Sequence, residues 1–280
     1  MRQLMASKES RLTLKTRLNQ RFLIRHRLLV LQSMFAPSVG EMRRFKGIGR
    51  GQRCFILGNG PSLKRMDPIP LRREATFGVN AIYLARDWLG FLPTYHVTED
   101  PLVIADRGRE ISEMTGPVKF YHRHFRSQIP PNGAVVHPRI FHDYSDYPDF
   151  PRFSRDASRC LWTGGSVSYL CLQLAFYMEY SPVILVGFDH HYERPENTVV
   201  RGTVWTSPGD DPNHFDPDYF GHGRRWYPPD MGRIEQAFAR ARQVYTQHHR
   251  RLLNATDGGR LDVLTRLSYR SLFDQPAASA

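Results

Sequence analysis

The sequence lacks the features of several common protein classes. No apolar run approaches the ~20 residues that span a bilayer, and the charged start MRQLMASKESRLTLKTR has no apolar segment of the kind that a signal peptide requires. The three cysteines, Cys54, Cys160 and Cys171, are far apart and form no Cys-x-x-Cys pair. Neither a disulfide framework nor a zinc site is indicated, and no internal repeat is visible. We therefore expect a cytoplasmic globular protein.

Basic charge is unevenly distributed along the chain. The formal net charge is +12, and residues 1–50 hold 12 Lys and Arg against Glu9 and Glu41, so this segment carries ten of the twelve net charges. The rest of the chain is nearly neutral. This distribution argues against a nucleic-acid-binding fold, and we expect no nucleic-acid partner.

The basic segment has the spacing of a helix. Apolar side chains at Leu14, Leu18 and Phe22 recur on one helical face between residues 11 and 35, and Pro37 and Gly40 are expected to end the helix. Such a helix either rests on anionic lipid or a partner protein, or packs against its own domain or a dimer mate. We expect a basic helical extension over residues 1–50.

Residues 51–273 alternate between short apolar strands and helices. This βαβ rhythm predicts one α/β domain with a Rossmann-like parallel sheet flanked by helices, and residues 274–280 form a tail expected to be disordered. The expected strands are CFIL, ATFGV, PTYHVTED, KFYHR, GAVVHP, PVILVGFDHHY and RLLNAT, and the clearest helices are GGSVSYLCLQLAFYMEY and DMGRIEQAFARARQVYTQHHR.

The turn after the first strand is a candidate phosphate site. In Leu57-Gly58-Asn59-Gly60-Pro61-Ser62 the strand breaks at glycine, and a helix can start at Pro61 or be capped by Ser62. Its free N–H groups would then meet a phosphate at the carboxyl edge of the sheet. The Walker and Gly-x-Gly-x-x-Gly spacings are absent, and a tight turn that binds nothing is the alternative.

Polar residues also end the second and third strands. Asn80 follows FGV, and its amide can bond both a phosphate oxygen and a ribose or base group. Glu99 and Asp100 follow the third strand as adjacent carboxylates that would meet a sugar hydroxyl or Mg²⁺. A solvated turn before Pro101 is the alternative for these two residues.

Two further sites follow the same logic. Thr163-Gly164-Gly165-Ser166 opens the apolar helix and offers a hydroxyl cap and free N–H groups to an anion. Four polar residues follow the VILVG strand at the carboxyl edge of the sheet: Asp189, His190, His191 and Tyr192.

A long polar segment separates this strand from the last helix. Residues 193–229 lack periodicity and read as a lid or binding loop. Within it, His222 is flanked by Gly221 and Gly223, whose freedom would let a closing loop deliver an imidazole as a general base.

Taken together, these motifs resemble a known family. FILGNGPSL, FGVNAIYL, TGGSVSYLCLQLAFYMEYSPVILVGFDHHY, GDDPNHFDPDYFGHG and LLNATDGGRLDVLTRLSYRSLF are similar to bacterial MptE-like (6-hydroxymethylpterin diphosphokinase-like) domains. That family is often associated with polysaccharide and surface-glycan genes. It is similar in turn to the family-42 bacterial sialyltransferases. The resemblance implies a cytoplasmic enzyme that is soluble or peripheral on the inner membrane, with a glycan or small-molecule acceptor.

The sialyltransferase likeness implies roles for individual residues. Gly58, Asn59, Gly60 and Ser62 would hold the nucleotide of a CMP-sugar, and Asn80 would touch the donor, with Thr163, Gly164 and Gly165 matching the helix-start motif. His222 would deprotonate the acceptor, and His191 or Tyr192 would stabilise the departing phosphate. Such an enzyme would transfer a nonulosonic or sialic acid with no required cofactor.

The family resemblance leaves two alternatives open. A pyrophosphokinase would move diphosphate from ATP to a hydroxymethyl group and would need Mg²⁺ on Glu99, Asp100 or Asp189. A non-catalytic nucleotide-sugar-binding scaffold in glycan assembly would instead use the N-terminal helix as its contact. We favour the glycosyltransferase.

Overall fold

The main sheet of the protein has eight parallel strands. The computed structural model describes residues 37–144, 147 and 149–274. The strand order is β13-β12-β8-β1-β2-β3-β4-β5, and every neighbouring pair is parallel. The strands are β1 (Cys54–Leu57), β2 (Ala75–Val79), β3 (Tyr95–Thr98), β4 (Val118–Tyr121), β5 (Val135–Val136), β8 (Val183–Val186), β12 (Leu252–Asn254) and β13 (Thr265–Arg266). The predicted α/β class is confirmed.

Both faces of the central strands are covered. All four residues of β1 and of β8 are buried, which explains why these strands read as continuous apolar runs rather than as alternating ones. Cys54 and Ile56 join a core cluster with α5 and α6, whereas Phe55 and Leu57 join a second cluster on the opposite face. The sheet is therefore the middle layer of three.

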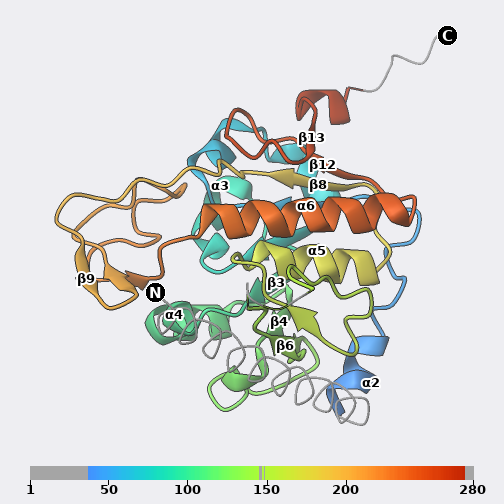
Figure 1. The fold of residues 1–280 in the computed structure, drawn as a ribbon, viewed down its shortest axis with the longest axis horizontal. Coiled ribbons are helices and arrows are strands. Elements are labelled where there is room, and N and C mark those ends of the chain that lie inside the picture. Colours follow the sequence, from blue (N-terminus) through green and yellow to red (C-terminus); the bar gives the residue numbers. More distant parts are fainter. Residues whose placement is uncertain (1–36, 145–146, 148, 275–280) are drawn as a thin grey trace, which may run out of the picture.

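Helices α5 and α6 lie side by side across one face of the sheet (Figure 1). All ten residues of α5 are buried, and α6 is amphipathic and begins where the Asp230 side chain accepts a hydrogen bond from the Arg233 N–H. The helices are α2 (Pro37–Arg43), α3 (Arg86–Leu89), α4 (Pro101–Glu113), α5 (Ser168–Tyr177) and α6 (Met231–Gln247), with 3₁₀ segments η1 (Pro61–Arg65), η2 (Ile69–Arg73), η3 (Ile82–Ala85), η4 (Arg123–Phe125) and η5 (Arg270–Leu272).

The connectivity reverses direction between β1 and β8. From β1 the chain runs outward through β2, β3, β4 and β5, and it then returns to place β8 on the other side of β1. The chain leaves β1 toward β2 and leaves β8 toward β12, which lies in the opposite direction. A crevice therefore opens at the carboxyl ends of β1 and β8. Open α/β sheets bind their ligands at such a switch point.

The segment 193–229 has more regular structure than its sequence predicts. Strands β9 (Val199–Arg201), β10 (Val204–Thr206) and β11 (Arg225–Trp226) form an antiparallel sheet of three strands, with β9 far from the main sheet (Figure 1). The expectation of an aperiodic loop was wrong because strands of two or three residues are too short to show alternation. A second small sheet pairs β6 (Ile140–Phe141) with β7 (Leu161–Trp162).

One expected helix cannot be compared with the structure, and another differs from its expectation. The predicted helix over residues 11–35 lies outside the described residues, and Pro37 and Gly40, expected to end it, lie inside α2, where proline is tolerated in a first turn. The expected helix after the first strand is η1, a 3₁₀ segment of five residues that has no side-chain cap. Ser62 does not cap it because the Ser62 hydroxyl bonds Asp189 instead.

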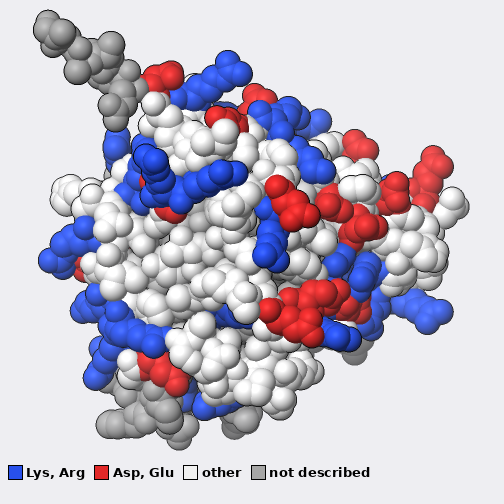
Figure 2. All heavy atoms as spheres, turned by 180° about the vertical axis from the view of Figure 1, so that it is seen from behind, with Lys and Arg blue, Asp and Glu red and all other residues white. Residues whose placement is uncertain are grey.

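The described residues form no helix that is long and apolar enough to cross a membrane. Cys54, Cys160 and Cys171 are buried free thiols. On the face turned away from the viewer in Figure 1, basic and acidic side chains are interspersed around a largely uncharged central area (Figure 2).

Candidate functional site

A cavity of about 530 Å³ opens at the switch point of the sheet. The residues that follow β1, β2, β3 and β8 form one side of it, and the segment before α5 and the first turn of α6 form the other. It is lined by most of the residues predicted from sequence: Gly58, Asn59, Gly60, Asn80, Glu99, Asp100, Thr163, Gly165, Ser166, Asp189, His190, His191 and Tyr192. Ser62, Gly164 and His222 do not line it.

The turn after β1 is bound to Asp189, which follows β8. The Asp189 Oδ2 atom accepts hydrogen bonds from the Ser62 N–H at 3.1 Å and from the Ser62 hydroxyl at 2.6 Å. The N–H of Gly58 donates to Val186 O and that of Gly60 to Gly187 O. The expectation of free N–H groups therefore needs correction for Gly58, Gly60 and Ser62, because carbonyl groups and a carboxylate of the protein accept from them, whereas the Asn59 N–H bonds no other described residue.

The same geometry explains why residue 60 is glycine. Its φ of −68° is open to any residue, but a Cβ atom there would lie 1.9 Å from Asp189 Oδ2. Gly164 is also a packing residue, because its Cβ would lie 2.4 Å from the ring of Tyr169. Gly164 supports the wall of the cavity from behind.

Asn59 connects the turn after β1 to the neighbouring strand and to the loop before β11. Its Nδ2 donates to Val79 O at 3.1 Å and to the Tyr219 hydroxyl at 2.7 Å. The Asn59 Oδ1 atom is buried and has no hydrogen-bond partner among the described residues. Buried polar atoms normally have a hydrogen-bond partner, so this oxygen is an exception in the packing of the turn.

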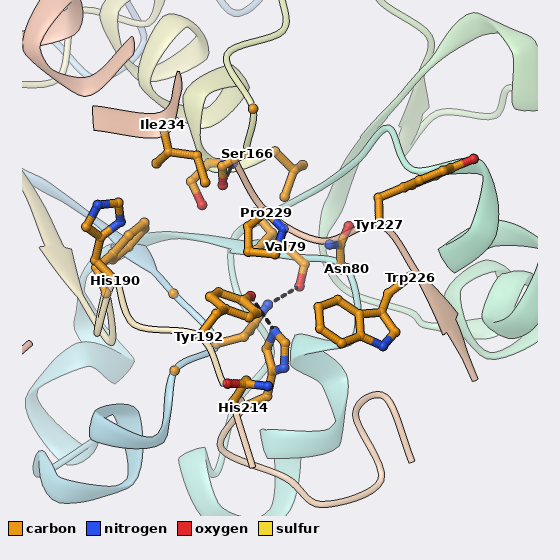
Figure 3. Close-up of a pocket in the computed structure, with 18 of the residues that line it drawn as sticks. Val79, Asn80, Ser166, His190, Tyr192, His214, Trp226, Tyr227, Pro229 and Ile234 are labelled. Atoms are coloured by element: carbon orange, nitrogen blue, oxygen red, sulfur yellow. Dashed lines mark hydrogen bonds between the residues drawn. The ribbon is translucent and has the colours of Figure 1, made fainter. Parts of the chain in front are cut away.

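Asn80 occupies a left-handed backbone position, with φ of 50°. Its carbonyl oxygen accepts a hydrogen bond from His96 Nε2 at 2.7 Å, and Oδ1 accepts one from Thr98 Oγ1 at 3.0 Å. Burial lowers the pKa of His96 to about 4, so this imidazole is neutral, and its Nδ1 accepts from the Tyr121 hydroxyl at 2.9 Å. These contacts fix Asn80 against the cavity (Figure 3).

The adjacent carboxylates after β3 have different roles. Asp100 caps α4, since its Oδ1 accepts from the Leu102 N–H at 2.8 Å. Glu99 has no hydrogen bond to another described residue. Burial, with the charge of Asp100, raises the pKa of Glu99 to about 7, and Arg233 acts in the opposite direction. Glu99 is therefore poised to exchange a proton or to meet a cation near neutral pH.

The segment before α5 supplies more free donors than the turn after β1. The N–H groups of Gly165, Ser166 and Val167 bond no other described residue, and all three residues line the cavity. Thr163 is not a helix cap, because its Oγ1 accepts from the Asp143 N–H. Ser166 Oγ instead accepts from the Ser168 N–H at 3.3 Å.

The two histidines after β8 are paired with carboxylates. His190 Nε2 lies 3.0 Å from Glu235 Oε1 on α6, and His191 Nε2 lies 3.1 Å from Glu193 Oε1. The His190 side chain is nearly buried at 7% exposed, whereas that of His191 is 43% exposed. His190 therefore joins the β8 segment to α6, and His191 lies at the rim.

Tyr192 enters a chain of hydrogen bonds that the sequence analysis did not find. Its hydroxyl lies 3.0 Å from His214 Nε2, and His214 Nδ1 lies 2.6 Å from Asp211 Oδ2. Figure 3 shows Tyr192 and His214 facing each other across the cavity wall. The side chains of His214 and Asp211 are only 6% and 3% exposed.

His222 is exposed and lies outside the cavity. Its Nδ1 donates to Pro208 O at 2.8 Å, between the strands β10 and β11. The neighbouring Gly223 has φ of 76°, a left-handed backbone conformation that favours glycine. The structure does not bring His222 to the other predicted site residues.

Arg233 and an aromatic wall complete the cavity, and the sequence analysis missed both. Arg233 is the only Lys or Arg among the described residues that line it, and its guanidinium donates to Asp143 O and lies 5.0 Å from the ring of Phe150. The wall consists of Phe188, Tyr192, His214, Tyr219, Phe220, Trp226, Tyr227 and Phe238. In the sequence, nothing distinguishes Arg233 from the other arginines of its helix. The only signal for the aromatic wall is the high density of aromatic residues between positions 214 and 227.

For Mg²⁺, the donor chemistry of the site fits a substrate-bridged ion. Within the described part of the chain, no three His, Cys, Asp or Glu side chains are grouped to hold a metal. Mg²⁺ is commonly bound by one or two carboxylates together with substrate phosphates. Glu99, which has no competing hydrogen bond, is the carboxylate that fits this arrangement, whereas Asp100 and Asp189 accept hydrogen bonds from the protein.

Comparison with known proteins identifies the family. The chain is similar in structure to the MAf glycosyltransferase from Magnetospirillum magneticum AMB-1, with a TM-score of 0.48, 15% sequence identity and coverage of 82% of this chain. The match spans only 38% of the length of that structure. No curated protein matches the chain. The model of the 6-hydroxymethylpterin diphosphokinase MptE-like family matches residues 27–195, which is more than half of the sequence. The chain belongs to the MptE-like family.

Proposed function

We propose that the protein is a transferase that binds a nucleotide-activated donor in the cavity at the switch point. The favoured reaction is transfer of a nonulosonic or sialic acid from a CMP-activated donor to a glycan acceptor. The observation that carries the proposal is the convergence of β1, β2, β3 and β8 strand ends on one cavity with unpaired N–H groups, one arginine and an aromatic wall. The family description, which names a diphosphokinase, supports transferase chemistry.

The donor phosphate has a suitable set of partners. The unpaired N–H groups of Gly165, Ser166 and Val167 precede the buried helix α5, where the helix dipole favours an anion. Arg233 adds a positive charge at the same cavity. The aromatic wall would contact the base or the sugar.

The glycosyl transfer would proceed by inversion. The acceptor oxygen attacks the anomeric carbon, the bond from that carbon to the CMP phosphate breaks, and the acceptor proton passes to a base. His222 stays our proposal for this base, since its Nδ1–H donates to Pro208 O and leaves Nε2 free to accept a proton. For the departing phosphate we choose Tyr192, whose hydroxyl is oriented by His214, over His191, whose imidazole is paired with Glu193.

One observation favours a second candidate, a Mg²⁺- and ATP-dependent diphosphokinase. Glu99 is a carboxylate without a hydrogen-bond partner among the described residues, and it lies beside Asp100 in the cavity. Mg²⁺ on Glu99 would neutralise phosphate charge, while the chain itself would hold the nucleotide through Arg233 and the segment before α5.

A ligand panel separates the two candidates. Thermal unfolding would be followed with CMP, a CMP-nonulosonate, UDP-sugars and ATP, each with and without Mg²⁺, because a ligand that binds the native state raises Tm. We expect CMP and its sugar to raise Tm without Mg²⁺. A rise with ATP and Mg²⁺ alone would replace the glycosyltransferase by the diphosphokinase.

The scaffold alternative has its own test. Transfer to a glycan acceptor would be measured for the native protein and for His222→Ala, with His249→Ala as a control, since His249 is an exposed histidine outside the cavity. We expect His222→Ala to lose transfer while its CMP affinity is kept. A non-catalytic scaffold would be favoured by two results together. The protein would bind a nucleotide but transfer nothing to any acceptor, and cells that carry His222→Ala would retain the biological function of the protein.

A further inference from the structure

The Asp211, His214 and Tyr192 side chains form a chain of hydrogen bonds that runs from the buried Asp211 and His214 to Tyr192, which is 37% exposed and lines the cavity. Asp211 is fixed in place, because its Oδ1 accepts from the Asn213 N–H at 2.8 Å and its Oδ2 accepts from the Phe220 N–H at 3.0 Å. The His214 ring stacks on Tyr219 with centroids 3.9 Å apart and an interplanar angle of 8°. His214 therefore has one orientation.

The partners of His214 determine its tautomer. A carboxylate only accepts hydrogen bonds, so Nδ1 carries a proton and donates to Asp211 Oδ2 at 2.6 Å. In the neutral imidazole Nε2 is then an acceptor, and the Tyr192 hydroxyl donates to it at 3.0 Å. In this state the Tyr192 proton points to His214 and is not available to a ligand.

A proton on Nε2 of His214 would reverse this last hydrogen bond. Nε2–H would donate to the Tyr192 oxygen, and the Tyr192 O–H would turn toward the cavity. One proton is taken from the solvent, and no covalent bond between heavy atoms changes. The net charge of Asp211 and His214 together goes from one negative charge to zero. An anion in the cavity favours that change on both counts, since it gains a donor and loses a neighbouring net negative charge.

We propose that Asp211 and His214 are positioning residues that couple the binding of a phosphate group to the uptake of one proton, with Tyr192 as the hydroxyl that contacts the phosphate. The inference rests on the proposed function, because it requires a phosphate-bearing ligand in this cavity. In a CMP-sugar reaction the phosphate gains negative charge as the sugar leaves, so the same hydroxyl would bind the departing group more tightly than the donor.

The other titratable groups around this chain are consistent with the assignment. His214 faces Asp211 and Tyr219 from its own loop and Tyr192 from the segment after β8. Burial and the groups Tyr219, Asp211 and Asp189 raise the pKa of Tyr192, so this phenol keeps its proton and acts as a donor. The proton that is taken up therefore resides on His214.

The test is the pKa of His214, measured by NMR with and without CMP; the His214 signal is assigned by its loss in His214→Gln. Cytidine, which lacks the phosphate, and inorganic diphosphate, which lacks the nucleoside, are the comparison probes. We expect CMP and diphosphate to raise the pKa of His214 by about one pH unit, equivalent to a tenfold change in proton affinity, and cytidine to leave it unchanged.

Two tyrosine variants distinguish coupling from simple packing. Tyr192→Phe removes the contact to His214 and should abolish most of the rise. Tyr144→Phe removes the hydroxyl of an exposed tyrosine that does not line the cavity, and it should preserve the rise. An unchanged pKa of His214 while calorimetry shows CMP bound would overturn this inference alone. An unchanged pKa with no binding of CMP or diphosphate would overturn the inference and the proposed function together.

Discussion

The contact between Gly60 and Asp189 allows a quantitative prediction. In Gly60→Ala the backbone needs no change, because φ is −68°, but the new Cβ would lie 1.9 Å from Asp189 Oδ2. The Asp189 side chain must move away and lose its hydrogen bonds from the Ser62 N–H and hydroxyl. Hydrogen bonds to a charged group contribute about 1.5–3 kcal/mol each, and alanine recovers about 0.4–1 kcal/mol through the unfolded chain. Allowing for the partial exposure of Asp189, we expect a net loss of about 2–4 kcal/mol.

Urea denaturation at pH 7 would measure this loss as a change in the free energy of unfolding. Gly133→Ala is the matched control, since a Cβ at Gly133 meets no atom within 4 Å, and it should change stability by no more than about 0.5 kcal/mol. In an Asp189→Ala background the cost of Gly60→Ala should fall by at least about half. A cost for Gly60→Ala equal to that of Gly133→Ala, or a cost unaffected by Asp189→Ala, would refute the reasoning.

Three further predictions concern single side chains. The folded pKa of Glu99, about 7, lies above its ordinary value of 4.5, so between these pH values the folded state retains a proton that the unfolded state has lost. The free energy of unfolding therefore falls as pH rises from 4.5 to 7, by up to about 1.4 kcal/mol per pH unit. Urea denaturation of Glu99→Gln at pH 5 and pH 8 should lack this contribution, and an identical pH dependence in the native protein and the variant would contradict it. Asn59→Ala leaves Val79 O and the Tyr219 hydroxyl without their donor and should cost about 1–3 kcal/mol by the same assay, so a neutral result would exclude a structural role for this amide. Arg65→Ala removes an exposed pair with Asp257, a hydrogen bond to the Asp257 carbonyl and a 4.0 Å approach to Asp189, and it should cost less than about 1 kcal/mol by the same assay. A larger loss would show that these contacts of Arg65 are more than a surface ion pair.

The sequence predicted seven of the eight strands of the main sheet, all but β13, and the edge at which the site lies, because both depend on local patterns. Buried runs such as β1 and β8 are read directly from the sequence, and polar residues after each strand end gather at one edge of any parallel sheet. The strand order was not readable, yet it is what brings Asp189 to the turn at Gly60.

Contacts between distant segments account for the rest. Nothing near Ser62 in the sequence indicates that a carboxylate 127 residues away accepts from its N–H and hydroxyl, so the Ser62 N–H was wrongly expected to be free. His214 reads as a histidine among turn residues, because its partner Tyr192 lies 22 positions earlier. His222 has the glycine neighbours of a mobile base, but sequence spacing says nothing about its distance from the cavity.

The central claim is that the cavity at the switch point binds a nucleotide through its phosphate. Calorimetric titration of CMP, and of ATP with Mg²⁺, into the native protein, Arg233→Ala and Arg240→Ala tests it directly. Arg240 lies on the same helix α6 but outside the cavity, where it bonds Gln243. We predict binding at one site, weakened at least about tenfold in Arg233→Ala, as expected for loss of a charge-assisted phosphate contact, and unchanged in Arg240→Ala. Absence of nucleotide binding, or equal affinities in the two arginine variants, would contradict the account.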